Sequence, residues 1–336
     1  MKVILILVVF ALGCLKAFQY PQIGVYLMSW IGYMNPHRLV HWSFVYSLPL
    51  AAIAFAVTAI SYLFYKDKPK NWFAPQVGLL IVFFLWAIIC TYNGVFPDYA
   101  EKELLRFFKI LLGILLTIIL IRKKEHIIYL VWVIYLSIGY YGIKGGVFTI
   151  ATGGSYLVWG PPGTFIEGNN ELALALLIIL PFGYFLLQQY ENKWVKRCLI
   201  LSMLLIVASA LGSHSRGALL ALVASGGFLW LKSKSKLALG GVILIGLLVA
   251  VPFLPDQWFE RMETIQTYEQ DASAMGRINA WTVAVNIAND RITAGGFNHW
   301  GAETFALYAP NPHDTHDAHS IYFEVLGELG YPGLIL

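Results

Sequence analysis

The stretch ELALALLIILPFGYFLLQQY, residues 171–190, decides the fold class, because no charged side chain follows Glu171 until Glu191. A helix of about 20 apolar residues is long enough to cross the hydrocarbon core of a bilayer, which is about 30 Å thick. Comparable runs recur along the chain, in which 58% of the 336 residues are hydrophobic and only 12% are charged. A soluble protein of this length could not bury so much apolar surface. The sequence therefore predicts a polytopic protein whose surroundings are the lipid bilayer, and no nucleic-acid partner.

Hydropathy in windows of about 19 residues predicts where the spans lie. The predicted spans are near 3–18, 43–65, 73–92, 104–121, 126–143, 171–190, 197–212, 217–231 and 237–254. Residues 20–34 form either a short span or an interfacial helix, and a last apolar run extends from about 320 to Leu336.

We therefore expect an all-α polytopic membrane protein with about 10–11 transmembrane helices and a large helical loop on the extracytoplasmic side. The expected division is a helical bundle over 1–254, the loop over 255–318, and the start of C-terminal transmembrane helices over 319–336. Because the last apolar run stops inside a helix, we expect the chain to be truncated at its C-terminus.

The basic residues indicate which ends of the spans face the cytoplasm. Four segments follow alternate spans and together hold 12 of the 23 Lys and Arg residues: KDKPK (66–70), RKK (122–124), KWVKR (193–197) and KSKSK (232–236). By the positive-inside rule their side is cytoplasmic. The other connections are then expected on the outer side: 93–103, 144–169, 212–216 and 255–318.

Two arginines stand on the predicted outer side in positions that suit anion binding. Arg216 is the only charged residue in the turn LGSHSRGALLAL (211–222), and Arg277 stands in SAMGRINAW (273–281), where an amphipathic helix is expected. Each has an ordinary alternative: Arg216 as a residue that reaches the lipid headgroups, and Arg277 as a surface residue. Two fixed guanidinium groups would suit a diphosphate better than one. Arg291 is a third candidate for substrate binding.

A histidine cluster, PNPHDTHDAHS (310–320), precedes the last apolar run. Zinc-binding histidines on a helix usually stand four apart, whereas His313, His316 and His319 stand three apart, so we expect no metal site and no cofactor. A metal site with Asp314 and Asp317 as extra ligands is the alternative. We expect His319 in the first helical turn, where the helix dipole favours a neutral imidazole that is suited to general base catalysis. His313 and His316 are expected to be loop residues at the entrance of the site. The alternative for His319 is an interfacial side chain that only forms hydrogen bonds.

Carboxylates and asparagines near the same side are further candidates. Glu324 and Glu328 lie inside the last apolar run, where an ionisable side chain is costly and usually faces protein or water. Glu324 is expected to support the site or to take part in it. In GPPGTFIEGNNELALAL (160–176), Asn169 or Asn170 is expected to cap the following helix, and Asn170 is also a candidate for contacting a sugar.

Four segments in order, SRGALLAL, GRINAW, AGGF and HSIYFEVLGELGYPGLIL, resemble the shared motifs of the O-antigen ligase and O-antigen polymerase superfamily. YMNPHRL (33–39) and GPPGTFIEGNNELALAL resemble the O-glycosylation ligases that accompany exosortase A systems. The resemblance extends over nearly the whole chain. The motif arginines of the family fall on Arg216 and Arg277, and the motif histidine falls on His319, although many relatives have asparagine where this chain has Ser320.

The resemblance implies a metal-independent glycosyltransferase of the bacterial inner membrane, with its active site facing the periplasm. The donor would be a glycan on undecaprenyl diphosphate, and the acceptor would offer a hydroxyl group. Arg216 and Arg277 would hold the diphosphate, and His319 would take the proton of the acceptor. A polysaccharide polymerase of the O-antigen type uses the same donor chemistry and is the first alternative.

A lipid-linked glycan transporter or flippase is the alternative from another class of protein. Transporters tend to place polar sites near the middle of the bilayer. Here the middles of most predicted spans are uncharged and the polar residues gather at the outer ends, which favours the enzyme.

Overall fold

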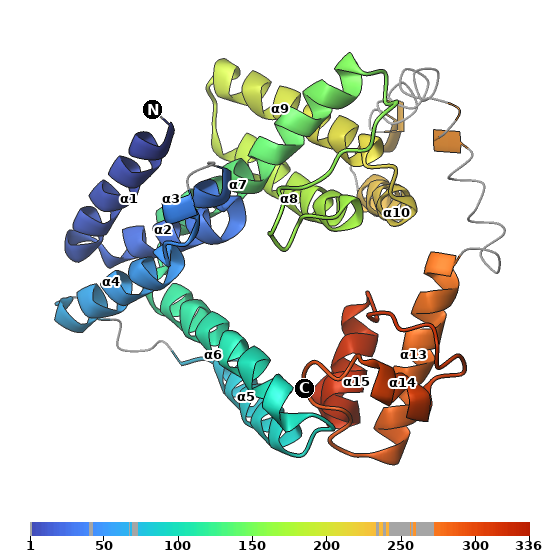
Figure 1. Ribbon diagram of the computed structural model, residues 1–336. Coiled ribbons are helices and arrows are strands. Elements are labelled where there is room, and N and C mark those ends of the chain that lie inside the picture. The colour runs from blue at the N-terminus through green and yellow to red at the C-terminus, as the bar shows by residue number, and fades with distance from the viewer. Residues whose placement is uncertain are drawn as a thin grey trace. The chain divides into compact units, whose positions relative to one another are not determined.

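The computed structural model describes residues 2–39, 43–66, 68, 73–232, 235–237, 240–241, 256, 258–259 and 272–336 (Figure 1). In these ranges every regular element is helical, which confirms the all-α fold class. The chain forms two compact units. Unit 1 comprises residues 1–68 and 120–265, and unit 2 comprises residues 69–119 and 266–336.

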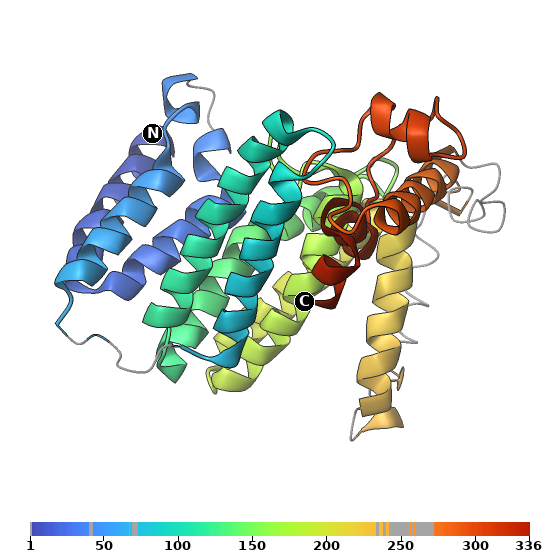
Figure 2. The same cartoon turned by 90° about the horizontal axis from the view of Figure 1, so that it is seen from below.

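Unit 1 contains most of the long apolar helices. Its elements are α1 (Lys2–Gln19), α2 (Pro21–Met34), η1 (Pro36–Leu39), α3 (Ser43–Tyr46), α4 (Leu50–Phe64), α7 (Lys124–Ala151), α8 (Asn169–Gln189), α9 (Lys193–Gly212) and α10 (Arg216–Lys232). The helices α7, α8 and α9 pack on one another, as the green to yellow ribbons of Figure 2 show. A Cβ on Gly146 of α7 would lie 2.1 Å from the Leu205 carbonyl oxygen of α9, so glycine permits this close packing.

Unit 2 combines two helices from the middle of the chain with three from its end. These are α5 (Pro75–Tyr92), α6 (Pro97–Leu120), α13 (Ala272–Asp290), α14 (Ala302–Tyr308) and α15 (Ile321–Ile335). α13 packs against α14 and α15, and α15 packs against α5. The indole Nε1 of Trp86 on α5 donates to the Leu329 carbonyl on α15 over 2.7 Å. At Gly330 the backbone of α15 takes a φ of 68°, and Pro332 follows, so this helix is kinked.

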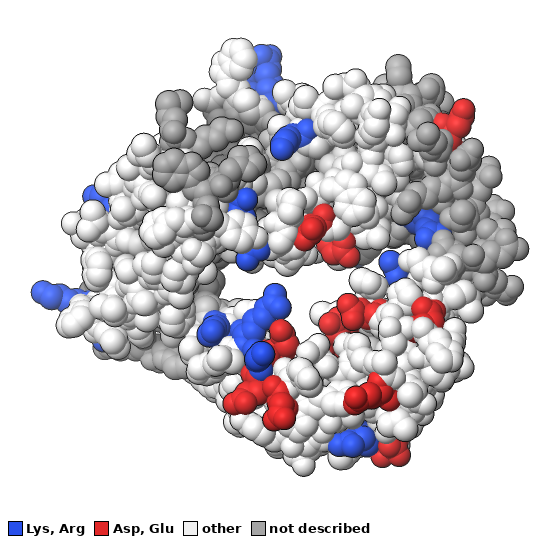
Figure 3. Space-filling view, viewed as in Figure 1, with Lys and Arg blue, Asp and Glu red and all other residues white. Residues whose placement is uncertain are grey.

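Four helices in the described part of the chain, α5, α7, α8 and α9, are long and apolar enough to cross a membrane. Two more, Val3–Gln19 and Leu50–Phe64, are apolar but shorter. Large apolar side chains on these helices face outward, as at Leu174 and Leu204, which are 57% and 63% exposed. Most of the visible surface in Figure 3 likewise belongs to residues other than Lys, Arg, Asp and Glu. Such a surface is suited to lipid.

Several predicted boundaries were wrong. The span expected at 43–65 is two helices, α3 and α4. Pro49 explains the break, because it has no backbone N–H for a helical hydrogen bond and disfavours helical backbone at Leu48. The connection expected to begin at 144 begins only after Ala151, where α7 ends. The short stretch 20–34 is the helix α2, which packs against α1, α4 and α7. The span expected at 237–254 falls mostly outside the described residues.

Candidate functional site

In unit 1, Arg216 begins α10 directly after a tight, buried turn. His214 in this turn has a φ of 52°, and its Nε2 lies 2.8 Å from the Gly154 carbonyl oxygen. The Asn169 side chain donates to the Ser213 carbonyl over 2.9 Å. Two connections predicted on the outer side, 144–169 and 212–216, therefore lie together at one end of unit 1. The turn that carries Arg216 is held by partners from both α8 and the loop before it.

In unit 2, α13 holds the histidine loop in place through two side chains. The Asn279 amide donates to the carbonyls of Asn311 and Asp314, each over 2.8 Å. Trp281 donates from its indole Nε1 to the Ala318 carbonyl over 2.7 Å, and its ring stacks on Phe323 with the centroids 4.8 Å apart. These bonds satisfy backbone carbonyls of a loop that is otherwise irregular. Loop 309–320 is thus anchored to α13 at several points.

Arg277 lies on α13 between the residues that contact this loop. In the part of the chain that the structure describes, its Nε atom is buried and has no hydrogen-bond partner. Trp281 stands one helical turn later, on the same side of α13. A buried guanidinium nitrogen without a hydrogen-bond partner is costly. This atom is therefore suited to donate a hydrogen bond to an acceptor atom of a ligand.

His316 packs directly on α13. A Cβ at Gly276 would lie 2.5 Å from the His316 Nδ1 atom, so only glycine leaves room for the ring. The same Nδ1 lies 2.7 Å from the Asp314 Oδ1 atom, although the angles are not those of a hydrogen bond. The ring of His316 therefore packs on α13 at Gly276, the residue that precedes Arg277.

His319 is exposed and stands before α15 rather than inside it. The helix begins at Ile321 with Ser320 as its N-cap, so the expectation of a histidine in the first helical turn was wrong. The backbone of His319 takes a φ of 45°, a left-handed conformation that is uncommon for residues other than glycine and often marks functional positions. Glu324, one turn into α15, interacts electrostatically with both His319 and Asp317.

Two other candidates have structural contacts. Arg291 donates from Nη2 to the Asn93 carbonyl over 2.5 Å, which joins the end of α13 to the loop after α5. Asn170 stands in the first turn of α8, and neither it nor Asn169 is the N-cap. Gly168 has that position without a side-chain cap, and the Asn169 amide donates to the Ser213 carbonyl.

Among the described residues, no group of three or more His, Cys, Asp and Glu side chains is placed to share a metal ion. The three loop histidines are not arranged as a metal-binding set.

One buried histidine was missed from the sequence. His299 follows the turn AGGF (294–297), is 0% exposed, and has its Nδ1 3.1 Å from the Gly296 carbonyl oxygen. Burial lowers its pKa from 6.5 to about 4, and the hydrogen bond to Gly296 opposes this shift in part. The glycines of the turn are the sequence feature that could have indicated this burial, because a Cβ at Gly295 would lie 2.4 Å from the ring of His299.

The burial of His299 predicts that unit 2 loses stability in acid. Its folded-state pKa lies below the unfolded value, so the stability that it contributes is complete above pH 6.5 and is lost as the pH falls towards 4. The loss should reach roughly 3 kcal/mol. Thermal unfolding in detergent across this range measures it, and His299→Phe should flatten the dependence relative to the exposed control His313→Gln. Equal pH slopes in all three proteins would contradict the assignment.

Gly276→Ala should displace His316. In a helix this substitution ordinarily stabilises by up to about 1 kcal/mol, but here the added carbon would overlap the imidazole ring. We expect a net destabilisation of about 1–3 kcal/mol, measured by thermal unfolding. Gly113→Ala in α6 of the same unit is the matched control, because nothing lies within 4 Å of its Cβ position. A stabilisation equal to that of the control would show that His316 does not pack there.

Two family models match consecutive parts of the chain. One, described as "Family of unknown function (DUF5935)", matches residues 1–191, and the other, described as "O-Antigen ligase", matches residues 201–336. No curated protein and no solved structure matches the chain. Arg216, Arg277 and His319 all lie in the second match, which supports the O-antigen ligase superfamily. The chain therefore belongs to the family of unknown function DUF5935, and its residues 201–336 carry the similarity to the O-antigen ligases.

Proposed function

We propose that this protein is an integral membrane glycosyltransferase, an O-glycosylation ligase of the kind associated with exosortase A systems. It would transfer a glycan from an undecaprenyl-diphosphate carrier to a hydroxyl acceptor at the periplasmic face of the bacterial inner membrane. The O-antigen ligase match supports a membrane enzyme that acts on a lipid-linked glycan. The observation that most supports the site is on α13. In the described part of the chain the Arg277 Nε atom is buried without a hydrogen-bond partner, and the same helix packs against His316 of the histidine loop.

The arginines would act on the leaving group. The anomeric carbon–oxygen bond to the diphosphate would break, and guanidinium groups would stabilise the negative charge that develops on the diphosphate. Arg277 of unit 2 and Arg216 of unit 1 are each a candidate for this role. Fixed cations of this kind contribute roughly 3–4 kcal/mol each when they are aimed at the developing charge. Since guanidinium groups supply this charge, the proposed reaction uses no metal ion.

His319 would act on the acceptor. Its imidazole takes the proton of the acceptor hydroxyl, whose oxygen forms the new bond to the anomeric carbon. Glu324 would stabilise the imidazolium that results, because it already interacts electrostatically with His319. The proton then passes to solvent, since His319 is exposed. His316, held between Gly276 and Asp314, would line the approach to the site, and Asn170 remains a candidate for contacting the sugar.

The test is transfer by the purified protein in lipid nanodiscs, supplied with a labelled undecaprenyl-diphosphate-linked glycan and a protein fraction of the native host. Movement of label onto protein supports the ligase. Lengthening of the lipid-linked glycan would instead support the polymerase, which the O-antigen ligase similarity also allows. Movement of intact donor across a vesicle membrane with no transfer would overturn both in favour of a transporter.

A further inference from the structure

The turn between α9 and α10 in unit 1 is buried, although its side chains are polar. Ser213, His214 and Ser215 all belong to the buried residues of the chain. Buried polar groups are costly unless they are hydrogen-bonded, so the partners of this turn decide its conformation. The turn ends at Arg216, the first residue of α10.

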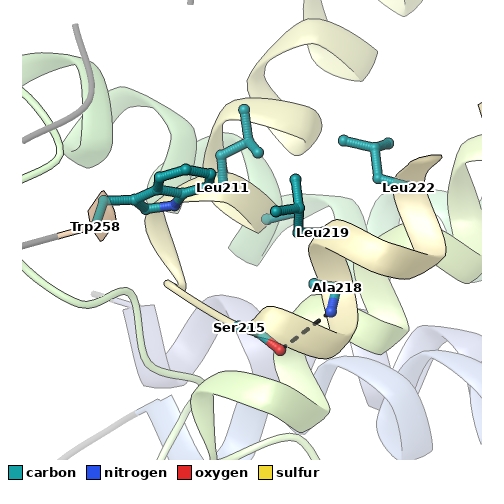
Figure 4. A pocket seen from close by; sticks show the side chains of 7 residues that line it. Leu211, Ser215, Ala218, Leu219, Leu222 and Trp258 are labelled. Atoms are coloured by element: carbon teal, nitrogen blue, oxygen red, sulfur yellow. Dashed lines mark hydrogen bonds between the residues drawn. The ribbon is translucent and has the colours of Figure 1, made fainter. Parts of the chain in front are cut away.

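Part of this hydrogen bonding lies within the turn itself. The Ser213 hydroxyl accepts from the Ser215 backbone N–H over 3.2 Å. The Ser215 hydroxyl accepts from the Ala218 backbone N–H, also over 3.2 Å, as Figure 4 shows, and so caps the first turn of α10. These bonds fix how Arg216 enters its helix, but they do not tie the turn to the rest of unit 1.

Two further hydrogen bonds tie the turn to segments that are far away in the sequence. The Val158 backbone N–H donates to the Gly212 carbonyl over 2.9 Å. The Asn169 amide donates to the Ser213 carbonyl over 2.9 Å, and Asn169 is itself buried. Loss of this amide would leave a buried carbonyl without its donor, which is costly. Asn169 therefore holds the backbone directly before Arg216.

A third long-range contact holds His214 in a strained conformation. Its φ of 52° is left-handed, and a residue other than glycine keeps such a conformation only where the surrounding structure holds it. The His214 Nε2 atom lies 2.8 Å from the Gly154 carbonyl oxygen. Since a carbonyl oxygen can only accept, this nitrogen is the one that carries the proton. Gly154 has a φ of 73°, which glycine adopts readily.

We propose that Asn169 and His214 are positioning residues for Arg216. They fix the turn, so that the guanidinium group is presented to the diphosphate from one defined backbone position. The inference rests on the proposed function, in which Arg216 is a candidate for stabilising the leaving diphosphate. Asn169 and Gly154 lie in residues 1–191, the part of the chain that matches the family of unknown function. This part thus contributes to the reaction by holding an arginine of the part that matches the O-antigen ligases.

Asn169→Leu tests the inference, because it removes the donor, keeps a similar volume and adds no charge. Glycan transfer should fall by about 10–100-fold, the loss expected when a catalytic group is displaced by about 1 Å. Affinity for inorganic diphosphate, measured by calorimetry on the full chain in nanodiscs, should fall with it. In the Arg216→Ala background Asn169→Leu should change neither quantity further, since a residue that acts through Arg216 has no effect once Arg216 is removed.

His214→Asn tests the same turn through its other partner, and it decides the question if Asn169→Leu does not fold. Asparagine tolerates a left-handed backbone well, but its side chain is too short to place a donor where the His214 Nε2 atom lies. We expect the same losses of transfer and of diphosphate affinity, and again no further loss in the Arg216→Ala background.

Tyr135→Phe is the matched control. Tyr135 is buried, and its hydroxyl lies 2.6 Å from the Ser202 hydroxyl, so this variant removes one hydrogen bond between α7 and α9 away from the turn. It should keep the wild-type transfer rate and diphosphate affinity.

Three results would overturn the inference. If Asn169→Leu or His214→Asn transfers glycan as well as Tyr135→Phe does, or if their losses are as large without Arg216 as with it, the inference is wrong and the proposed function still stands. If Arg216→Ala itself keeps the wild-type rate and diphosphate affinity, Arg216 has no part in the proposed function, and the inference fails with it.

Discussion

His319→Ala should lower glycan transfer by about 10²–10⁴-fold, the contribution that a positioned general base makes to a reaction of this type. The effect should fall on the rate at saturating donor, because His319 acts on the acceptor hydroxyl and not on the lipid diphosphate. Initial rates of label transfer, measured over a range of donor concentrations, provide the comparison. Donor affinity should change little.

His313→Ala is the control for this variant, because His313 is an exposed histidine of the same loop. It should keep most of the wild-type rate. A His319→Ala protein with more than half of the wild-type rate would refute the role of general base. A loss of equal size in His313→Ala would point to disruption of the loop in place of lost chemistry.

Arg277→Ala should lower transfer by about 10²–10³-fold, because it removes a cation aimed at the leaving diphosphate. Arg277→Lys should recover little, since a lysine ammonium lacks the planar fork that binds phosphate oxygens in pairs. Affinity for inorganic diphosphate should fall together with the rate. Both quantities are measured on the same nanodisc preparation, by calorimetry and by label transfer.

Arg106 on α6 of the same unit is the matched control. Its side chain is 68% exposed and lies 3.4 Å from Glu103, so Arg106→Ala removes one positive charge from unit 2 without touching the histidine loop. Transfer should then stay within about twofold of the wild type, since an exposed ion pair contributes little. If Arg277→Ala transfers glycan at the wild-type rate, Arg277 has no role in the reaction and its buried Nε atom is only part of the packing of unit 2.

Local patterns predicted some of this structure closely. The run at 171–190 became α8 at Asn169–Gln189, since an uninterrupted apolar stretch has one favourable arrangement in a bilayer. The break at Pro49 was missed, because hydropathy averaged over a window does not register one residue without a backbone N–H. His319 was misplaced by two residues, because the apolar run adjoins it while the helix begins only at Ile321.

The candidate site was predictable in its residue types but not in its contacts. Arg277 and His319 were chosen for their chemistry and for their resemblance to family motifs. Neither signal shows that Gly276 receives the ring of His316, or that Asn279 and Trp281 anchor the loop. His299 was missed for the same reason, since its burial depends on packing within unit 2 and not on its sequence neighbours.

The sequence by itself determined that this is an all-α membrane protein, because hydropathy and helical periodicity are properties of neighbouring residues in one segment. It also determined which side chains were chemically able to bind a diphosphate or accept a proton. Only the tertiary structure decided that the histidine loop is bound to α13 and that an Arg277 nitrogen is buried without a described partner. These are contacts between residues far apart in the chain, and their energies arise from packing that no single segment contains.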